Sequence, residues 1–149
     1  MKEVLVLGIG NRLMRDDGIG VYVVEELTNR NTNPDIRYVI GETDIYYCLN
    51  YIKKATYIIV VDAACLSKEP GEISTHPLEQ VFKNPIQPIS MHDSHLLRDI
   101  EMTDKSIEGL FIGIEPDEIN YSFGLSATLQ EQFFKIVEEI ENIITSQVR

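Results

Sequence analysis

The sequence predicts an α/β fold with three layers, in which a mostly parallel sheet of about five strands lies between helices. Strand-like and helix-like segments alternate along most of the chain, as in successive strand–helix–strand units. Residues 4–7 and 57–62 are almost wholly apolar, as expected for strands that helices cover on both faces. A length of 149 residues suits one compact domain, so residues 1–149 are expected to form a single domain.

The first part of the chain alternates regularly between the two kinds of element. The run at 4–7 is short and rich in β-branched residues, which favours a central strand. Residues 18–29 place apolar side chains at helical spacing, with Glu25 and Glu26 outside that stripe. In order, we expect a strand at 4–7, a helix at 18–29, a strand at 36–40, a helix at 44–54 and a strand at 57–62.

The second part begins at a Pro70-Gly71 turn, which predicts a short edge strand that runs antiparallel to its neighbour. Three prolines punctuate residues 77–91 and predict a loop with at most one short helical turn. Ser126 suits the N-cap of a long final helix. In order, we expect a strand at 72–75, a helix at 93–101, a strand at 108–114 and a helix at 126–146.

The segment at residues 8–20 carries the strongest chemical signal. Gly8 and Gly10 allow a tight turn where the first strand ends, and Asp16 and Asp17 fall where the next helix begins. The positive end of a helix stabilises ionised carboxylates, and carboxylate oxygens at the carboxyl ends of parallel strands suit a metal ion. A dinucleotide site is disfavoured, because its third glycine would fall at Leu13, and no P-loop lysine follows.

Asp62 and the histidines supply further candidates. Asp62 ends an apolar strand, where it could either bind a ligand or cap local backbone amides. His92 and His95 lie three residues apart, a spacing that alone is a weak metal signal, and His76 is interpreted as a surface residue. Carboxylate and imidazole ligands suit borderline divalent cations such as Ni²⁺ or Zn²⁺. The chain contains neither a Gly-x-Ser-x-Gly elbow nor an HExxH sequence.

The composition narrows the class of partner. A net charge of −11 argues against binding to nucleic acid or to an anionic membrane. Cys48 and Cys65 have no metal-finger spacing and are interpreted as reduced thiols of a cytoplasmic protein. The first residues do not resemble a signal peptide, and no apolar run approaches the length of a membrane span. We expect a monomer in the cytoplasm.

The pattern Gly-x-Gly-Asn-x-Leu-x-x-Asp-Asp-Gly-x-Gly at residues 8–20 strongly resembles the opening of the hydrogenase maturation endopeptidases. The resemblance continues in Val60-Val61-Asp62-Ala63, Pro70-Gly71-Glu72-Ile73, Ser90-Met91-His92 and Phe111-Ile112-Gly113-Ile114-Glu115-Pro116. One departure is Glu42, which replaces a glycine that many members of that family carry after the second strand.

The resemblance implies an endopeptidase that removes the C-terminal extension of a nickel-containing hydrogenase large-subunit precursor after nickel insertion. Asp17, Asp62 and His92 are then the catalytic residues and the metal ligands, and the nickel is carried by the substrate precursor. Whether the protein also holds a metal of its own stays open. Asp16 is expected to cap the following helix through its first amides, so that Asp16→Asn is milder than Asp17→Asn.

Two alternative functions use the same residues. A nickel-binding or chaperone module would dock the precursor without cleaving it, and a generic metallohydrolase would bind its own metal. Roles for Glu42 and His95 also remain open at this level, although a solvated loop charge is favoured for Glu42.

Overall fold

The computed structural model describes residues 3–84, 91–102 and 107–148, and for Ile45 and residues 91–95 it describes the backbone alone. It contains a five-stranded sheet in the order β2-β1-β3-β5-β4. The first four strands of this order are parallel, and β4 pairs with β5 in the antiparallel sense at the edge. The strands are β1 Val4–Ile9, β2 Ile36–Glu42, β3 Tyr57–Ala63, β4 Ile73–Pro77 and β5 Glu108–Ile114.

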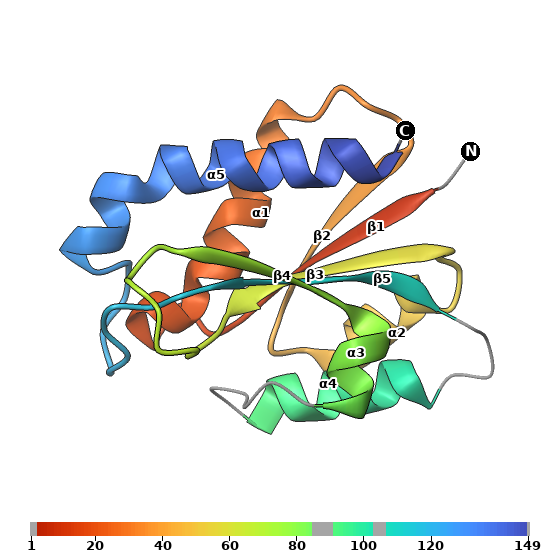
Figure 1. The fold of residues 1–149 in the computed structure, drawn as a ribbon, viewed down its shortest axis with the longest axis horizontal. Helices are drawn as coiled ribbons and strands as arrows, with labels where there is room; N and C mark the ends of the chain where they lie inside the picture. The colour runs from red at the N-terminus through yellow and green to blue at the C-terminus, as the bar shows by residue number, and fades with distance from the viewer. Residues whose placement is uncertain (1–2, 85–90, 103–106, 149) are drawn as a thin grey trace.

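Helices cover both faces of this sheet (Figure 1). One face packs against α1 and α5, and the other against α2, α3 and α4. A short 3-10 helix, η1, precedes α1. The helices are η1 Arg15–Gly18, α1 Ile19–Arg30, α2 Ile45–Ile52, α3 Leu78–Lys83, α4 Met91–Glu101 and α5 Ala127–Val148. The predicted α/β fold with a mostly parallel sheet of five strands is therefore confirmed.

The two central strands explain why the core forms where it does. Every residue of β1 and β3 is buried, because both strands have helices on both faces. The apolar stripe of α1 (Ile19, Val23, Val24 and Leu27) packs on one face together with the buried side of α5. In the described residues, no helix is long and apolar enough to cross a membrane.

One segment differs from the prediction. Residues 78–83, in a stretch expected to be loop with a short helical turn, form the six-residue helix α3. Pro77 occupies the N-cap of this helix, so the proline stands before the helix and does not interrupt it. Leu78 and Val81 are buried, and this packing offsets the weak intrinsic stability of so short a helix. The rest of the predicted loop, residues 85–90, lies outside the described residues.

Candidate functional site

Two of the predicted site residues, Asp17 and Asp62, lie at the carboxyl-terminal edge of adjacent strands. Asp17 belongs to η1, the turn that follows β1, and Asp62 is the penultimate residue of β3. The strands β1 and β3 pair directly, with Gly8 opposite Val61. Both carboxylates are almost fully buried, with 3% of Asp17 and none of Asp62 exposed. The structure therefore places two buried acids at the carboxyl-terminal ends of two neighbouring central strands.

Glycines allow η1 to lie close to the strand ends. Gly10 adopts φ 138°, and a Cβ there would collide with the carbonyl oxygen of Asp17. A Cβ on Gly20 would likewise collide with the carbonyl oxygen of Val61, one residue before Asp62. Gly8, which we expected in the turn, lies inside β1, where it faces the α1 side chain of Val24. These glycines set the close approach of η1 and α1 to β1 and β3.

The backbone around Asn11 orients the carboxylate of Asp17. The Asn11 amide donates to Oδ2 of Asp17 at 3.0 Å. The Asn11 side chain in turn accepts a hydrogen bond from the backbone amide of Leu13 at 2.9 Å. Asn11 therefore does two things: its side chain shapes the loop between β1 and η1, and its backbone amide holds the Asp17 carboxylate.

Asp16 does not cap α1, and the expectation that it does is wrong. It is fully buried, and its carboxylate accepts four hydrogen bonds from a distant segment. Oδ2 accepts from the amides of Asp117 and Glu118, both at 2.9 Å, and from Oγ of Ser126 at 2.7 Å. Oδ1 accepts from the Ser126 amide at 2.8 Å. Because η1 intervenes before α1, the carboxylate points to the segment before α5 and anchors it.

Ser126 connects this anchor to α5. Its Oγ accepts a hydrogen bond from the amide of Leu129 at 3.3 Å, the N-cap contact expected for this serine. The same hydroxyl donates to Asp16. The start of α5 is therefore tied to the turn that carries Asp17.

Asp62 and Glu115 organise the loop that follows β3. Oδ1 of Asp62 accepts from the amide of Ala63 at 2.7 Å, so local amide binding does occur, while a ligand role stays a prediction. Glu115, at the end of β5, is 7% exposed. Its Oε1 accepts from the amides of Leu66 at 2.8 Å and Lys68 at 3.2 Å. Sequence reasoning gave Glu115 no role, although it lies in a segment noted for its resemblance.

His92 lies in the first turn of α4, two residues further into helix than predicted, since α4 begins at Met91. His95 lies on the same helix, so the two residues are three apart on helical backbone. The N-terminal end of α4 lies on the side of the molecule toward which β1, β3 and β5 run (Figure 1). The side chains of both histidines lie outside the described part of the structure, so the ligand role of His92 stays a prediction.

Neither cysteine suits a nucleophile. Burial raises the pKa of the Cys48 thiol to about 11. Burial, followed by the negative charges of Glu115 and Asp17, raises the pKa of Cys65, although this side chain is exposed. Because the thiolate is the reactive form, both groups are protonated and weakly nucleophilic at neutral pH.

Glu42, whose role was open, forms an ion pair. Its Oε1 lies 2.6 Å from the guanidinium of Arg12, which also contacts Glu25 at 3.2 Å. This pairing, chiefly with Glu42, raises the pKa of Arg12. The interpretation of Glu42 as a solvated charge holds only in part, since the carboxylate is half-exposed but bridges the end of β2 to the glycine-rich loop.

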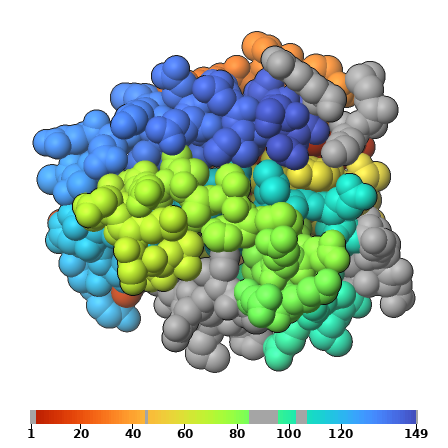
Figure 2. All heavy atoms as spheres, viewed as in Figure 1, coloured from red at the N-terminus to blue at the C-terminus, as the bar shows by residue number. Residues whose placement is uncertain are grey.

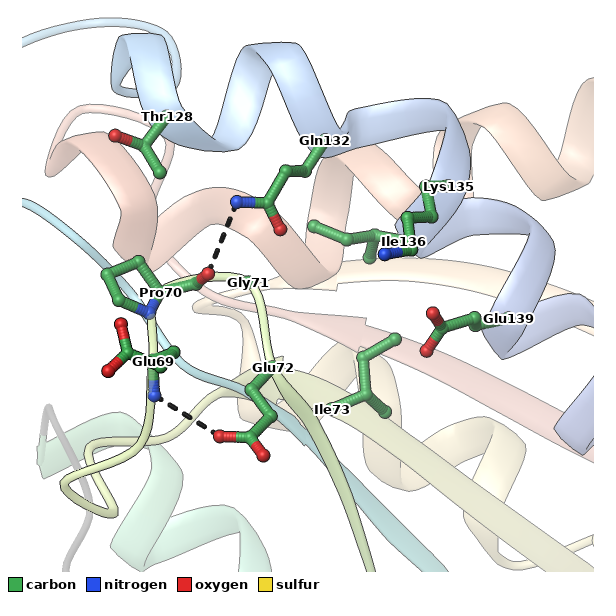
Figure 3. Close-up of a pocket in the computed structure, with 10 residues that line it drawn as sticks. All are labelled: Glu69, Pro70, Gly71, Glu72, Ile73, Thr128, Gln132, Lys135, Ile136 and Glu139. Atoms are coloured by element: carbon green, nitrogen blue, oxygen red, sulfur yellow. Dashed lines mark hydrogen bonds between the residues drawn. The ribbon is translucent and has the colours of Figure 1, made fainter.

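A second polar region lies away from these acids. A pocket of about 560 Å³ lies between α5 and the turn before β4, and Figure 3 shows its lining. Gln132 donates to the carbonyl oxygen of Pro70 at 3.3 Å, and the carboxylate of Glu72 accepts from the amide of Glu69 at 3.2 Å. Neither Asp17 nor Asp62 lines it. Within the described residues, no group of three or more His, Cys, Asp or Glu side chains is arranged to hold a metal.

Two buried acids thus lie on a glycine-rich turn and on an adjacent strand end of an α/β fold, and comparison with known proteins identifies the family of the chain. Residues 21–143 match the family model described as hydrogenase maturation protease. The match covers most of the chain, and the chain therefore belongs to the hydrogenase maturation proteases, which are endopeptidases.

Individual relatives agree with this assignment. The chain is 29% identical over 144 residues to the hydrogenase 2 maturation protease of Escherichia coli, covering 93% of this chain and 88% of that protein. It is 44% identical over 72 residues to the hydrogenase expression/formation protein HupD of Bradyrhizobium diazoefficiens. That second alignment spans 48% of this chain and only 38% of HupD.

The fold is also shared with solved structures. The hydrogenase maturating endopeptidase HybD from E. coli superimposes with a TM-score of 0.83 at 24% identity, covering 99% of this chain and 94% of that one. At this identity the likeness speaks for the fold alone.

Proposed function

We propose that this protein removes the C-terminal extension from a nickel-containing hydrogenase large-subunit precursor after nickel has been inserted. Membership of the maturation protease family supports the reaction class. The observation that carries the proposal is the pair of buried acids, Asp17 and Asp62, at one edge of adjacent strands. Burying carboxylates costs folding free energy, so two buried acids at this edge favour a chemical role.

In this proposal, Asp17, Asp62 and His92 contact the nickel that the precursor carries. Carboxylate oxygens and an imidazole nitrogen suit Ni²⁺, and this ligand set leaves coordination positions for the substrate. The metal then polarises the scissile carbonyl or a water molecule. Alternatively, Asp17 acts as general base on the water. The Asn11 amide and the glycine-rich turn hold the Asp17 carboxylate in place for either role.

The test is cleavage of purified precursor, followed by mass spectrometry of the released tail. Asp17→Asn, Asp62→Asn and His92→Ala are each expected to abolish cleavage of nickel-loaded precursor while circular dichroism shows an intact fold. His76→Ala is the matched control, because His76 lies on the edge strand β4 and contacts Ser74. Retained cleavage in any one of the three site variants would remove that residue from the proposed set.

Metal dependence tests the recognition step. Precursor without nickel is expected to stay uncleaved, because the ligands then have nothing to bind. Efficient cleavage of metal-free precursor would contradict the proposal and favour an ordinary hydrolase. Binding of the precursor without release of its tail would favour a chaperone role, and metal analysis of the purified protein would identify a metallohydrolase that holds its own ion.

A further inference from the structure

Three large apolar side chains are exposed on two segments that lie side by side next to the site. Leu13 is 60% exposed, Tyr121 is 91% exposed and Phe123 is 71% exposed. Leu13 belongs to the loop between β1 and η1, just before the turn that carries Asp17, and the two aromatic residues belong to the segment between β5 and α5. That segment forms one end of the molecule in the space-filling view, beside the start of α5 (Figure 2).

Backbone hydrogen bonds join the two segments. Met14 and Ser122 form a parallel bridge. The Ser122 amide donates to the carbonyl oxygen of Leu13 at 3.1 Å, and the Arg15 amide donates to the carbonyl oxygen of Ser122 at 2.9 Å. Leu13 and Tyr121 each directly precede a residue of the bridged pair, so the bridge brings the two exposed side chains onto neighbouring backbone.

Asp16 also holds the segment between β5 and α5 in place, through hydrogen bonds to its backbone. Its carboxylate holds the amides of Asp117 and Glu118, and its own amide donates to the carbonyl oxygen of Glu118 at 3.1 Å. The apolar side chains thus project from backbone that is held in place by the site loop. A fixed group of exposed apolar side chains is unfavourable in water, and such groups on soluble proteins mark interaction surfaces.

A pocket adjoins this surface. Phe123 lines an apolar pocket of about 340 Å³ together with Tyr22 of α1 and with Phe133 and Phe134 of α5. Phe134 is itself largely exposed. An apolar side chain of a partner could enter this pocket, which is the arrangement that binding hot spots adopt.

We propose that Leu13, Tyr121 and Phe123 form a docking surface for the folded body of the hydrogenase large-subunit precursor. This inference rests on the proposed function, since a precursor whose tail reaches Asp17 must lie over the adjoining surface. Leu13 lies in the loop whose Asn11 amide holds the Asp17 carboxylate, so the exposed apolar residues adjoin the turn that carries this acid. Leu, Tyr and Phe side chains suit the core of a protein interface.

The experiment measures steady-state cleavage of nickel-loaded precursor by the triple variant Leu13→Ser, Tyr121→Ser, Phe123→Ser. We expect KM to rise about tenfold or more with kcat unchanged, because truncating packed interface aromatics weakens binding by at least such a factor. The control is Met102→Ser, an exposed apolar residue just beyond the C-terminal end of α4, which is expected to leave both constants unchanged. Should the triple variant fold poorly, Tyr121→Ser alone serves, since its side chain is the most exposed of the three.

An unchanged KM, or a loss confined to kcat, would overturn the inference. Sedimentation analysis provides a further check. If the wild-type protein forms dimers that the triple variant disrupts, the surface pairs copies of this chain and the inference is wrong. The dissociation constant for the precursor, measured by calorimetry, separates the two proposals. Absent cleavage with tight, surface-dependent binding would contradict the protease function alone, whereas normal cleavage with surface-independent binding would contradict the docking surface alone.

Discussion

Replacing Asp16 by Asn should destabilise the fold strongly, because this carboxylate accepts four hydrogen bonds in a fully buried position. An amide keeps one oxygen and turns an NH₂ group toward at least one donor. If the oxygen stays with Asp117, Glu118 and the Ser126 hydroxyl, the contact to the Ser126 amide is lost. The other three bonds each weaken from charged to neutral, for a total of about 3 kcal/mol.

For a chain of this size, that loss corresponds to a fall in Tm of about 6–12 °C. The assay is thermal unfolding by circular dichroism, with Asp117→Asn as the control. Asp117 is exposed, and its Oδ2 accepts one bond from Thr128, which an amide oxygen can keep. We therefore expect the control to shift Tm by less than about 2 °C. A fall of less than 2 °C in Asp16→Asn as well would refute the anchoring role of this residue.

The neighbouring Asp17→Asn variant should behave in the opposite way. The Asn side chain can still accept from the Asn11 amide, and burying a neutral group costs less than burying a charge. We expect Tm to stay constant or rise while cleavage is lost. Comparing the two variants separates the residue that anchors the turn from the residue proposed to act in cleavage.

Three further predictions follow from the same region. Gly20→Ala should lower Tm by more than about 6 °C, because the new Cβ would collide with the carbonyl oxygen of Val61, and both residues belong to packed backbone that cannot move apart. An unchanged Tm would contradict this close packing. Arg12→Ala should cost less than about 2 kcal/mol in urea unfolding, since both of its ion pairs are partly exposed; a larger loss would show that the pairs are more protected than the structure indicates. Alkylation of Cys65 should require a higher pH than alkylation of an ordinary thiol, because the pKa of Cys65 is raised, and Asp17→Asn should lower that pH by removing one negative charge. Mass spectrometry of the modified peptide over a pH series measures this, and an unchanged pH dependence in Asp17→Asn would contradict the prediction.

The sequence allowed the fold to be predicted wherever local pattern and packing agree. The apolar runs of β1 and β3 predicted buried parallel strands, and the antiparallel edge strand followed from the Pro70-Gly71 turn. The helix α3 was predicted only as a short helical turn within a loop, because the prolines of this stretch are typical of loops. Only its burial against the sheet, a tertiary effect, makes the segment helical.

The role of Asp16 could not be predicted for a different reason. Its hydrogen-bond donors lie 101 to 110 residues further along the chain, so no local pattern reveals them. The same holds for Glu115, which binds amides 47 and 49 residues before it. The position of Asp17 and Asp62 at one edge was predictable because parallel strands bring their carboxyl ends together. Their proposed metal-binding role remains a prediction.

The contact between Asp16 and Ser126 has a consequence for the order in which the protein becomes competent during synthesis. The turn that carries Asp17 is made early, but the donors that Asp16 needs lie 101 to 110 residues later, on Asp117, Glu118 and Ser126. A nascent chain that ends before Asp117 therefore holds a carboxylate that only water can satisfy, and the turn lacks the four hydrogen bonds that tie it to the segment before α5. The contacts that anchor this turn are thus completed only after β5 and the segment that follows it have been made.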